Sequence, residues 1–451
     1  MRLALILSTL ALAVACAAAA TADAATVVVR FHAGAPGLRA HIATAPIYHT
    51  RVFRVRHLRA ALRQLRARPD VEYAVPDVRA HIADAAPFVP NDPGRGTAPG
   101  GWQTVQWNFT GPFGVNAPGA WANLIADGRP GGKGVVIAVL DTGIAYSKRN
   151  HGWLSPDLRQ THFIAGWDFV HNDPYAQDVN GHGTHVASTI AESTNNGIAL
   201  TGLAYGASIM PVQVLDSHGD GGAATIARGV RFAADHGAQV INLSLEFSPG
   251  VTASQIPELV DALNYAHRKG VFIVGASGNE ASSSIAYPAR TSVVMSVGST
   301  TEHGCVSDFS NGGRNLNIVA PGGGDDAQIP ADPNCHPALK PGHDIFQLTI
   351  EGAPGRRRFG IPGGYAGTSM ATPHVAAAAA LVIASGVLGS DPSPDAIKAR
   401  LIATARKLGP PAGDPLDYGA GLLDAAAATA PLVPPTTPTT PTTPTTPTTP
   451  K

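Results

Sequence analysis

From about residue 101 onward, short apolar segments alternate with longer segments of helical pattern. The apolar segments are rich in Val, Ile and small residues and lie at 135–140, 207–215, 238–245, 270–277 and 292–299. Helical windows lie between them, such as Ala223–His236 and Ile256–Lys269. Strands this apolar are buried on both faces, and the helices between them make parallel crossover connections. The sequence therefore predicts an α/β fold in which helices cover both faces of a mainly parallel central sheet.

Length and charge narrow the class of protein. The chain has 451 residues, of which 44% are hydrophobic, so it can bury a large core and form more than one domain. Its 32 basic residues balance its 32 acidic residues. A chain without net charge lacks the electrostatic signature of a nucleic-acid-binding protein, so we expect no nucleic-acid partner.

Residues 26–80 predict a small, separate α+β unit. Thr26–His32 and Val71–Val75 have strand patterns, and a helix that ends before Pro69 lies between them, with leucines on one face and arginines on the other. The segment holds ten Arg and three acidic residues, a balance of 10 − 3 = +7. Residues 1–25 carry one charge of each sign, so the remainder sums to −7, and the two parts are expected to be electrostatically complementary.

The first 25 residues have the pattern of a secretory signal peptide. One Arg precedes an apolar run from Leu3 to Ala15, which is shorter than a membrane-spanning helix requires. Residues 20–22 (Ala-Thr-Ala) fit an ordinary cleavage site, and Cys16 leaves open a lipoprotein signal. We expect a secreted protein with no transmembrane segment. The alternatives are a periplasmic protein or one anchored to a surface by lipid.

Two further segments predict no packed core. Residues 82–100 are rich in Pro, Gly and Asp, as is typical of a linker, and residues 431–451 contain five Thr-Thr-Pro repeats, which predict an extended tail. The expected organisation is a signal peptide at 1–25, a small unit at 26–81, a linker at 82–100, a main domain at 101–430 and a tail at 431–451.

Cys305 and Cys335 are the two cysteines beyond the signal segment. An even pair in an exported chain predicts a disulfide, and two buried free thiols are the alternative. Two isolated cysteines are too few for a metal site.

A serine lies between small residues in GYAGTSMATPHVA (364–376), and an apolar run follows it. Ser369 could be a helix cap, or it could be a nucleophile at the N-terminus of a buried helix whose first turn contains Pro373. A serine hydroxyl is a useful nucleophile only when a base removes its proton and a third group orients that base. A histidine and an aspartate in equally unusual settings would favour the second interpretation.

Three other polar residues lie in such settings. Asp141 ends an apolar segment and opens Asp-Thr-Gly, and α/β sheets bind ligands at the carboxyl ends of their strands. His182 lies in NGHGTHVA, and Asn279 lies in GASGNE, where its amide could stabilise an oxyanion. Each residue alone could equally belong to a turn or a helix cap. His185 is expected to be structural because no Glu completes an HExxH zinc motif.

Together and in this order, DTG, GHGTHVA, ASGNE and GTSMATPHVA resemble the subtilisin-like serine proteases. The resemblance extends from about Gln106 to about residue 428, with 322–362 as an irregular insertion. It implies a subtilisin-like three-layer fold and a serine endopeptidase that acts on polypeptides and needs no cofactor for its chemistry.

The resemblance also implies roles for individual residues. Asp141 would orient His182, His182 would act as general base and then as general acid, and Ser369 would attack while Asn279 holds the oxyanion. The substrate-binding residues that the resemblance implies are Ser244, Leu245, Glu246, Gly275, Ala276, Ser277 and Gly278.

Residues 26–81 resemble the family's ferredoxin-like prodomain, which assists folding and then inhibits the enzyme until it is cut away. The resemblance therefore implies a self-processed zymogen with its maturation site within 82–100, and we expect the mature enzyme to be a monomer. Many members bind structural Ca²⁺, and Asp157 and Asn195 match ligand positions, although the loop that carries Asn195 is one residue longer here. Three further acids could serve a second calcium site or be solvated, and we favour solvated acids: Asp168, Asp173 and Asp178.

The sequence departs from the family at Ser244-Leu-Glu-Phe247, where glycine usually replaces Glu246. Glu246, with Glu280 at the same rim, predicts a preference for Lys or Arg at P1, the residue whose carbonyl is attacked. A Glu246 side chain that points to solvent is the alternative.

Other classes of protein fit less well. A binding protein that merely retains a protease fold would be expected to have lost at least one of the four residues. An α/β-hydrolase esterase would carry its serine in G-x-S-x-G, ahead of its acid and histidine. A dinucleotide-binding enzyme would show G-x-G-x-x-G after an early strand.

Overall fold

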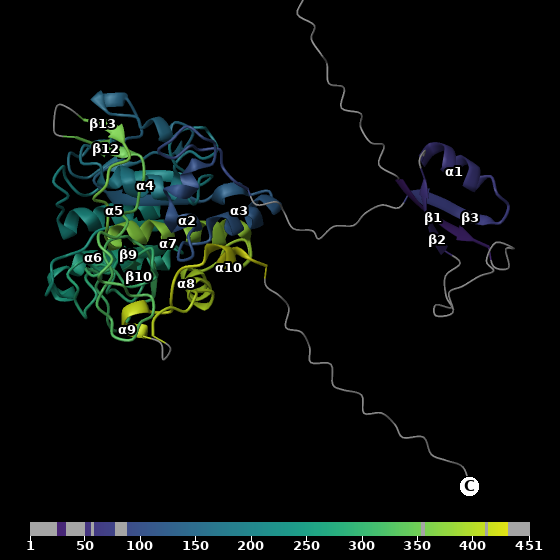
Figure 1. The fold of residues 1–451 in the computed structure, drawn as a ribbon. Coiled ribbons are helices and arrows are strands. Elements are labelled where there is room, and N and C mark those ends of the chain that lie inside the picture. Colours follow the sequence, from purple (N-terminus) through teal and green to yellow (C-terminus); the bar gives the residue numbers. More distant parts are fainter. Residues whose placement is uncertain are drawn as a thin grey trace, which may run out of the picture. The chain divides into compact units, whose positions relative to one another are not determined.

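The computed structural model describes residues 25–32, 50–55, 58–76, 88–352, 357–410 and 414–431 (Figure 1). The expected signal peptide up to residue 24 and the Thr/Pro-rich tail from residue 432 lie outside these ranges. The chain divides into two compact units, 1–84 and 85–451.

The first unit is a three-stranded antiparallel sheet with one helix. Its elements are β1 (Ala25–Phe31), β2 (Thr50–Val55), α1 (Leu58–Arg66) and β3 (Val71–Pro76), and the strand order is β2-β1-β3. Leu62 and Leu65 of α1 pack against Val27 and Val29 on one face of the sheet. Sequence patterns predicted β1, α1 and β3 but missed β2, in which charged and apolar residues are interleaved.

The other face of this small sheet carries exposed apolar side chains. Cross-strand pairing places Val28 beside both Val52 and Val75, and Tyr73 pairs with Arg30 two positions further along, on the same face. Val52 is 59% exposed and Val75 is 40% exposed. A sheet face this apolar is the kind of surface that proteins use to contact a partner.

The second unit contains an eight-stranded sheet in the order β11-β10-β9-β8-β4-β7-β5, with β6 also paired to β7. All of these pairs are parallel, which confirms the predicted sheet. The strands are β4 (Val136–Asp141), β5 (His162–Phe163), β6 (Trp167–Asp168), β7 (Ser208–Gln213), β8 (Val240–Leu243), β9 (Phe272–Ala276), β10 (Val294–Thr300) and β11 (Ile318–Pro321).

Helices cover both faces of this sheet, which gives the expected three layers (Figure 1). Alternate residues of β4 show this: Ile137 and Val139 belong to the core beneath α3, α4 and α7, whereas Ala138 and Leu140 face α5 and α6. The helices are α2 (Trp107–Thr110), α3 (Ala117–Ala126), α4 (His182–Ala191), α5 (Ala223–Asp235), α6 (Pro257–Arg268), α7 (Thr368–Ser385), α8 (Pro394–Ala403), α9 (Pro415–Tyr418) and α10 (Ala425–Thr429).

Helix α7 is the central helix of the domain. It contacts five strands of the sheet, β4 and β8 to β11, and the helices α3, α4, α8 and α10, and residues Ala376–Ala380 are completely buried. Of the described helices, α7 alone is long and apolar enough to cross a membrane, but its burial identifies it as a core helix. Its run of alanines allows the sheet and the neighbouring helices to approach closely.

The insertion at 322–362 is mostly irregular, as expected, but it contributes an antiparallel pair of short strands, β12 (Thr349–Glu351) and β13 (Arg358–Gly360). Cys335 in the insertion forms a disulfide with Cys305, with a Cα–Cα distance of 4.8 Å, which confirms the predicted bridge.

Residues 88–100, assigned to the linker from their composition, pack on the second unit instead. Phe88 lies against Trp121 and Tyr205, and the carbonyl of Pro90 accepts a hydrogen bond from the indole of the fully buried Trp102. These contacts place the start of the folded main domain at about residue 88 rather than 101.

The packing around α7 generates a prediction about stability. Replacing Ala378 by Leu should lower the free energy of unfolding by about 1–3 kcal/mol, because three extra carbons have no space inside a close-packed core. Ala403→Leu, at an exposed position on α8, is the matched control and should have little effect. Urea unfolding of the two variants measures the difference, and equal midpoints would contradict the close packing.

Candidate active site

Asp141 is the last residue of β4, at the carboxyl edge of the sheet, and its side chain is fully buried. One carboxylate oxygen, Oδ1, accepts the backbone N–H of Thr142 at 2.7 Å. The strand and this backbone hydrogen bond therefore fix the position of the carboxylate without the help of another side chain.

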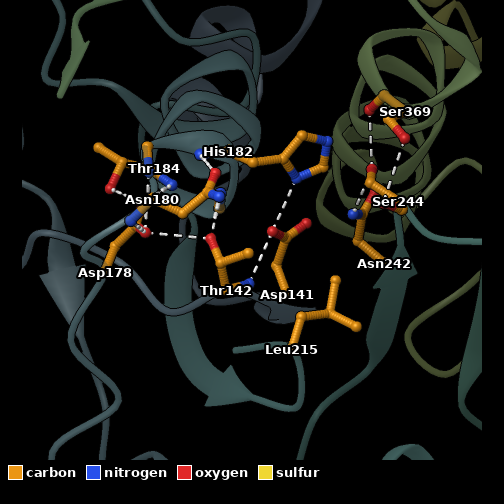
Figure 2. Close-up of polar contacts among 12 residues, drawn as sticks. Asp141, Thr142, Asp178, Asn180, His182, Thr184, Leu215, Asn242, Ser244 and Ser369 are labelled. Atoms are coloured by element: carbon orange, nitrogen blue, oxygen red, sulfur yellow. Dashed lines mark hydrogen bonds and ion pairs between the residues drawn. The ribbon is translucent and has the colours of Figure 1, made fainter. Parts of the chain in front are cut away.

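His182 is the first residue of α4, and its ring reaches back to β4. Its Nδ1 donates to Asp141 Oδ1 at 2.7 Å, and its side chain is 26% exposed (Figure 2). Gly183 makes this approach possible, because a Cβ atom there would collide with the carbonyl of Gly143 and lie 3.0 Å from Asp141 Oδ1. The bond leaves Nε2 as the nitrogen that can accept a proton.

Ser369 is the second residue of α7, where the backbone N–H groups have no partner within the helix. Its hydroxyl donates to the carbonyl of Ser244 at 3.2 Å. Figure 2 shows Ser369 and Ser244 beside the ring of His182, with Asp141 below the ring. The hydroxyl of Ser369 is thus bonded to Ser244 rather than to His182. A serine in this position can still react, because catalytic hydrogen bonds often form fully only in the substrate complex.

Pro373 lies at the sixth position of α7, not in the first turn as the sequence suggested. A proline has no N–H, so the carbonyl of Ser369, four residues earlier, loses its usual helical partner. The hydroxyl of Ser244 donates to that carbonyl at 2.8 Å instead. The serine of α7 and the segment after β8 are thus joined by two hydrogen bonds in opposite directions.

Asn279 follows β9, and its side-chain amide has a fixed orientation. Its Oδ1 accepts hydrogen bonds from the backbone N–H of Thr368 at 2.8 Å and from the hydroxyl of Thr368 at 3.0 Å. Because Thr368 occupies the oxygen, Nδ2 is the part of the amide that stays available as a donor to other groups, as an oxyanion donor requires.

A cleft of about 430 Å³ contains both His182 and Ser369. Of the predicted substrate-binding residues, Ser244, Leu245 and Glu246 line it. Gly275, Ala276, Ser277 and Gly278 do not line it. The lining residues that the sequence did not indicate are Thr142, Asn180, Leu215, His218, Gly219, Asp220, Gly221, Ile226, Phe247 and Ser248.

Asp178 is buried, in contrast to the expectation that it is a solvated acid. It accepts five hydrogen bonds, including those from the hydroxyl of Thr142 at 3.0 Å and the hydroxyl of Thr184 at 2.6 Å (Figure 2). Thr142 is next to Asp141, and Thr184 lies in the first turn of α4. Asp178 therefore ties the strand that carries the aspartate to the helix that carries the histidine. In the sequence, the position of Asp178 four residues before His182 was the one feature that could have indicated this supporting role.

Asp168 is also buried rather than solvated. Its carboxylate accepts hydrogen bonds from the backbone of Val170 and His171, and the His171 ring contacts it at 2.7 Å. These contacts close a local turn after β6. The carboxylate of Asp168 is therefore occupied by this turn and does not serve as a ligand for a second metal ion.

The histidines of the domain differ in their protonation. Burial alone would lower the pKa of His182, but the charge and hydrogen bond of Asp141 outweigh burial and hold that pKa above its usual value. The charge of Asp178 acts in the same direction. Burial lowers the pKa of His185 to about 3 and that of His374 to about 4, so both are neutral, as expected for structural residues.

Asp157, one of the two expected calcium ligands, belongs to a buried group of carboxylates with Asp92 and Glu192. Burial raises the pKa of Asp157 to about 8. The other expected ligand, Asn195, accepts a hydrogen bond from the backbone of Asn91, and Asn196 is the residue that contacts Asp157, at 2.7 Å.

The part of the chain that the structure describes holds no three His, Cys, Asp or Glu side chains that converge as metal ligands. One oxygen of Glu192 nevertheless has no hydrogen-bond partner, and no described Lys, Arg or His pairs with Asp92, Asp157 or Glu192. Buried carboxyl oxygens without a counter-charge fit the chemistry of Ca²⁺, whose charge would favour their ionised form.

Comparison with known proteins agrees with this geometry. The model of the Subtilase family, Peptidase_S8, matches residues 132–421. The chain is 38% identical to subtilisin BL of Lederbergia lenta over 327 residues, which are 72% of this chain and 99% of that protein. It is 37% identical to thermitase of Thermoactinomyces vulgaris over 298 residues, which are 66% of this chain and 88% of that one.

A solved protease structure from Pseudoalteromonas arctica superposes with a TM-score of 0.58 at 30% sequence identity and covers 76% of this chain and 99% of that chain. This likeness confirms the subtilisin-like three-layer fold. The segment matched by the family model includes Asp141, His182, Asn279 and Ser369. The chain therefore belongs to the subtilase family and is a subtilisin-like serine endopeptidase.

Proposed function

We propose that the chain is made as an inactive precursor, is exported, and is converted by its own active site into a secreted endopeptidase. The observation that carries the catalytic part is the 2.7 Å bond between His182 and Asp141 at the cleft that Ser369 lines. The export signal at residues 1–25 supports the secreted location.

The hydrogen bond to Asp141 holds the proton of His182 on Nδ1, so Nε2 takes the proton of Ser369 when a peptide occupies the cleft. The Ser369 oxygen then attacks the scissile carbonyl, and negative charge develops on the carbonyl oxygen. Nδ2 of Asn279 and the free N–H of Ser369 at the start of α7 are the donors for that charge.

Collapse of the tetrahedral intermediate breaks the peptide bond. His182 returns its proton to the departing amine, which leaves an acyl group on Ser369. Water then enters, His182 removes its proton, and the same donors stabilise the second oxyanion before the acid is released. The charge of Asp141 stabilises the imidazolium in both halves.

The small first unit suits the role of an inhibitory prodomain. Its exposed apolar face around Val52 and Val75 has no partner among the residues of this unit that the structure describes. Its positive balance of +7 complements the acidic remainder. Because β3 ends at Pro76 and the main domain is packed from Phe88, we place the maturation cut between them.

Calcium is proposed as a structural ion of the main domain. Asp157 and Asp92 would hold it beneath the loop that contains Asn196, and the ion would supply the positive charge that this buried group lacks. It takes no part in the chemistry of Ser369.

Self-processing tests the zymogen. Expressed without residues 1–25, the chain should shorten to a product that begins between residues 77 and 88, whereas Ser369→Ala should stay whole because it lacks the nucleophile. Ser254→Ala, an exposed serine elsewhere, is the control and should be processed normally. N-terminal sequencing reads the result. Identical products from the parent chain and Ser369→Ala would show that another protease makes the cut.

Asp178→Asn should lower kcat/KM about 10- to 100-fold, because His182 and Asp141 lose a shared support. In the parent enzyme kcat/KM should rise with pH as His182 loses its proton, with an apparent pKa above the ordinary value of a histidine because of the charge of Asp141. The variant has one negative charge fewer near His182, so this limb should move to lower pH. Asp173→Asn is the control. If the apparent pKa of kcat/KM is the same in Asp178→Asn and in the parent enzyme, Asp178 has a purely structural role.

Removing calcium should lower the melting temperature by roughly 5 °C, since an ion present at 100 times its Kd stabilises the fold by about 2.7 kcal/mol. Thermal unfolding of the Ser369→Ala chain in EDTA and in Ca²⁺ avoids self-digestion. Asp157→Asn should abolish the difference, and Asp173→Asn should preserve it. If the melting temperature of the Ser369→Ala chain is the same in EDTA and in Ca²⁺, the proposal of a structural calcium ion is wrong.

A further inference from the structure

Glu246 follows β8 and lies in the cleft, where its carboxylate contacts the residue that we assign to the oxyanion. Its Oε1 accepts a hydrogen bond from Nδ2 of Asn279 at 2.8 Å, and its Oε2 accepts the backbone N–H of Asn279 at 3.2 Å. Thr368 fixes the other end of the amide, so Nδ2 cannot turn elsewhere without breaking two hydrogen bonds. In the free enzyme, a carboxylate therefore occupies the donor that catalysis needs.

This contact defines where Glu246 lies relative to a substrate. During attack, the carbonyl oxygen of P1 must lie between Nδ2 of Asn279 and the N–H of Ser369. The carboxylate of Glu246 is bound to that same Nδ2. The P1 side chain, which starts at the carbon next to the carbonyl, must therefore begin within a few ångströms of Glu246.

The surroundings of Glu246 are negative and lack a counter-charge. Glu280 is the nearby charged group, and its carboxylate is held by Nδ2 of Asn311 at 2.6 Å. Burial and the charge of Glu280 together raise the pKa of Glu246 to about 7. In the described ranges no Lys, Arg or His forms an ion pair with Glu246 or Glu280. Two neighbouring carboxylates in this state are stabilised by any cation that reaches them.

The backbone leaves room for the carboxylate. Gly278 has φ +113°, and a Cβ atom there would lie 2.6 Å from Oε2 of Glu246 and would collide with the amide of Asn311. A larger residue at this position would displace Glu246 from Asn279. The carboxylate is thus part of the built cleft rather than a side chain that extends into solvent.

We propose that Glu246 selects substrates with Lys or Arg at P1. Its carboxylate releases the amide of Asn279 only when the cation of P1 takes the place of that amide as its partner. The cation of P1 pairs with Glu246, and Nδ2 becomes free to bind the oxyanion. An apolar P1 side chain offers Glu246 no partner, so the carboxylate continues to compete for the donor. This inference rests on the proposed roles of Asn279 and Ser369.

Cleavage of matched peptide anilides that differ only at P1 tests the idea. The processed enzyme should cleave substrates with Arg or Lys at P1 at least tenfold better, in kcat/KM, than those with Phe or Leu. Glu246→Gln keeps the shape but cannot ionise, and it should reduce the ratio of Arg to Phe tenfold or more. Glu246→Gly removes the side chain and should raise cleavage after Phe. Glu258→Gln, an exposed glutamate on α6, should leave the ratio unchanged.

The readout is a ratio between substrates, so a general loss of activity in a variant does not imitate it. A preference for Phe or Leu in the parent enzyme, or an unchanged ratio in both Glu246 variants, would overturn the inference. Labelling of Ser369 by a sulfonyl fluoride separates this failure from that of the proposed function. An enzyme that is labelled but prefers apolar P1 residues refutes only the selection by Glu246, whereas one that is neither labelled nor active refutes both.

Discussion

The burial of α7 on every side is the constraint on which the active site depends. A helix that contacts five strands and four other helices cannot shift without disturbing the whole core, and its N-terminus is therefore held in place. Thr368 binds Asn279 from that end, and Ser369 binds the segment at Ser244. One rigid helix thus positions Ser369, which we propose as the nucleophile, the amide of Asn279, which we propose as the oxyanion donor, and one wall of the cleft.

Local patterns were enough to predict the sheet, α7 and the disulfide. The catalytic roles of Asp141, His182, Asn279 and Ser369 come from the ordered motifs that resemble the family, and they stay a prediction. The strands are continuous apolar runs, and each of these four residues lies within two positions of a glycine. The roles of Asp178 and Asp92 were missed for a physical reason. Acids beside Asn, Gly and Pro have the composition of a solvated loop, whereas their burial arises from donors elsewhere in the chain, such as Thr142 for Asp178.

Two predictions about side-chain direction show the same limit. The sequence identified Glu246 as unusual, but its partner Asn279 is 33 residues away and only the fold brings them together. In the loop that we expected to bind calcium, Asn195 adopts a left-handed backbone with φ 61°, and its side chain contacts Asn91. The next residue, Asn196, contacts Asp157. Motif matching cannot detect such a shift by one residue, because both positions are asparagine.

The proline within α7 has a mechanical consequence. An ordinary helix holds each carbonyl by its own next turn, so its first turn moves with the rest of the helix. Here Pro373 removes that hold at Ser369, and the carbonyl is bound by Ser244 on a different part of the sheet. The backbone of the nucleophile is thus coupled to the wall against which a substrate would lie. A peptide that displaces this wall would therefore also displace the backbone of Ser369. Binding in the cleft and alignment of the proposed nucleophile are coupled through this hydrogen bond.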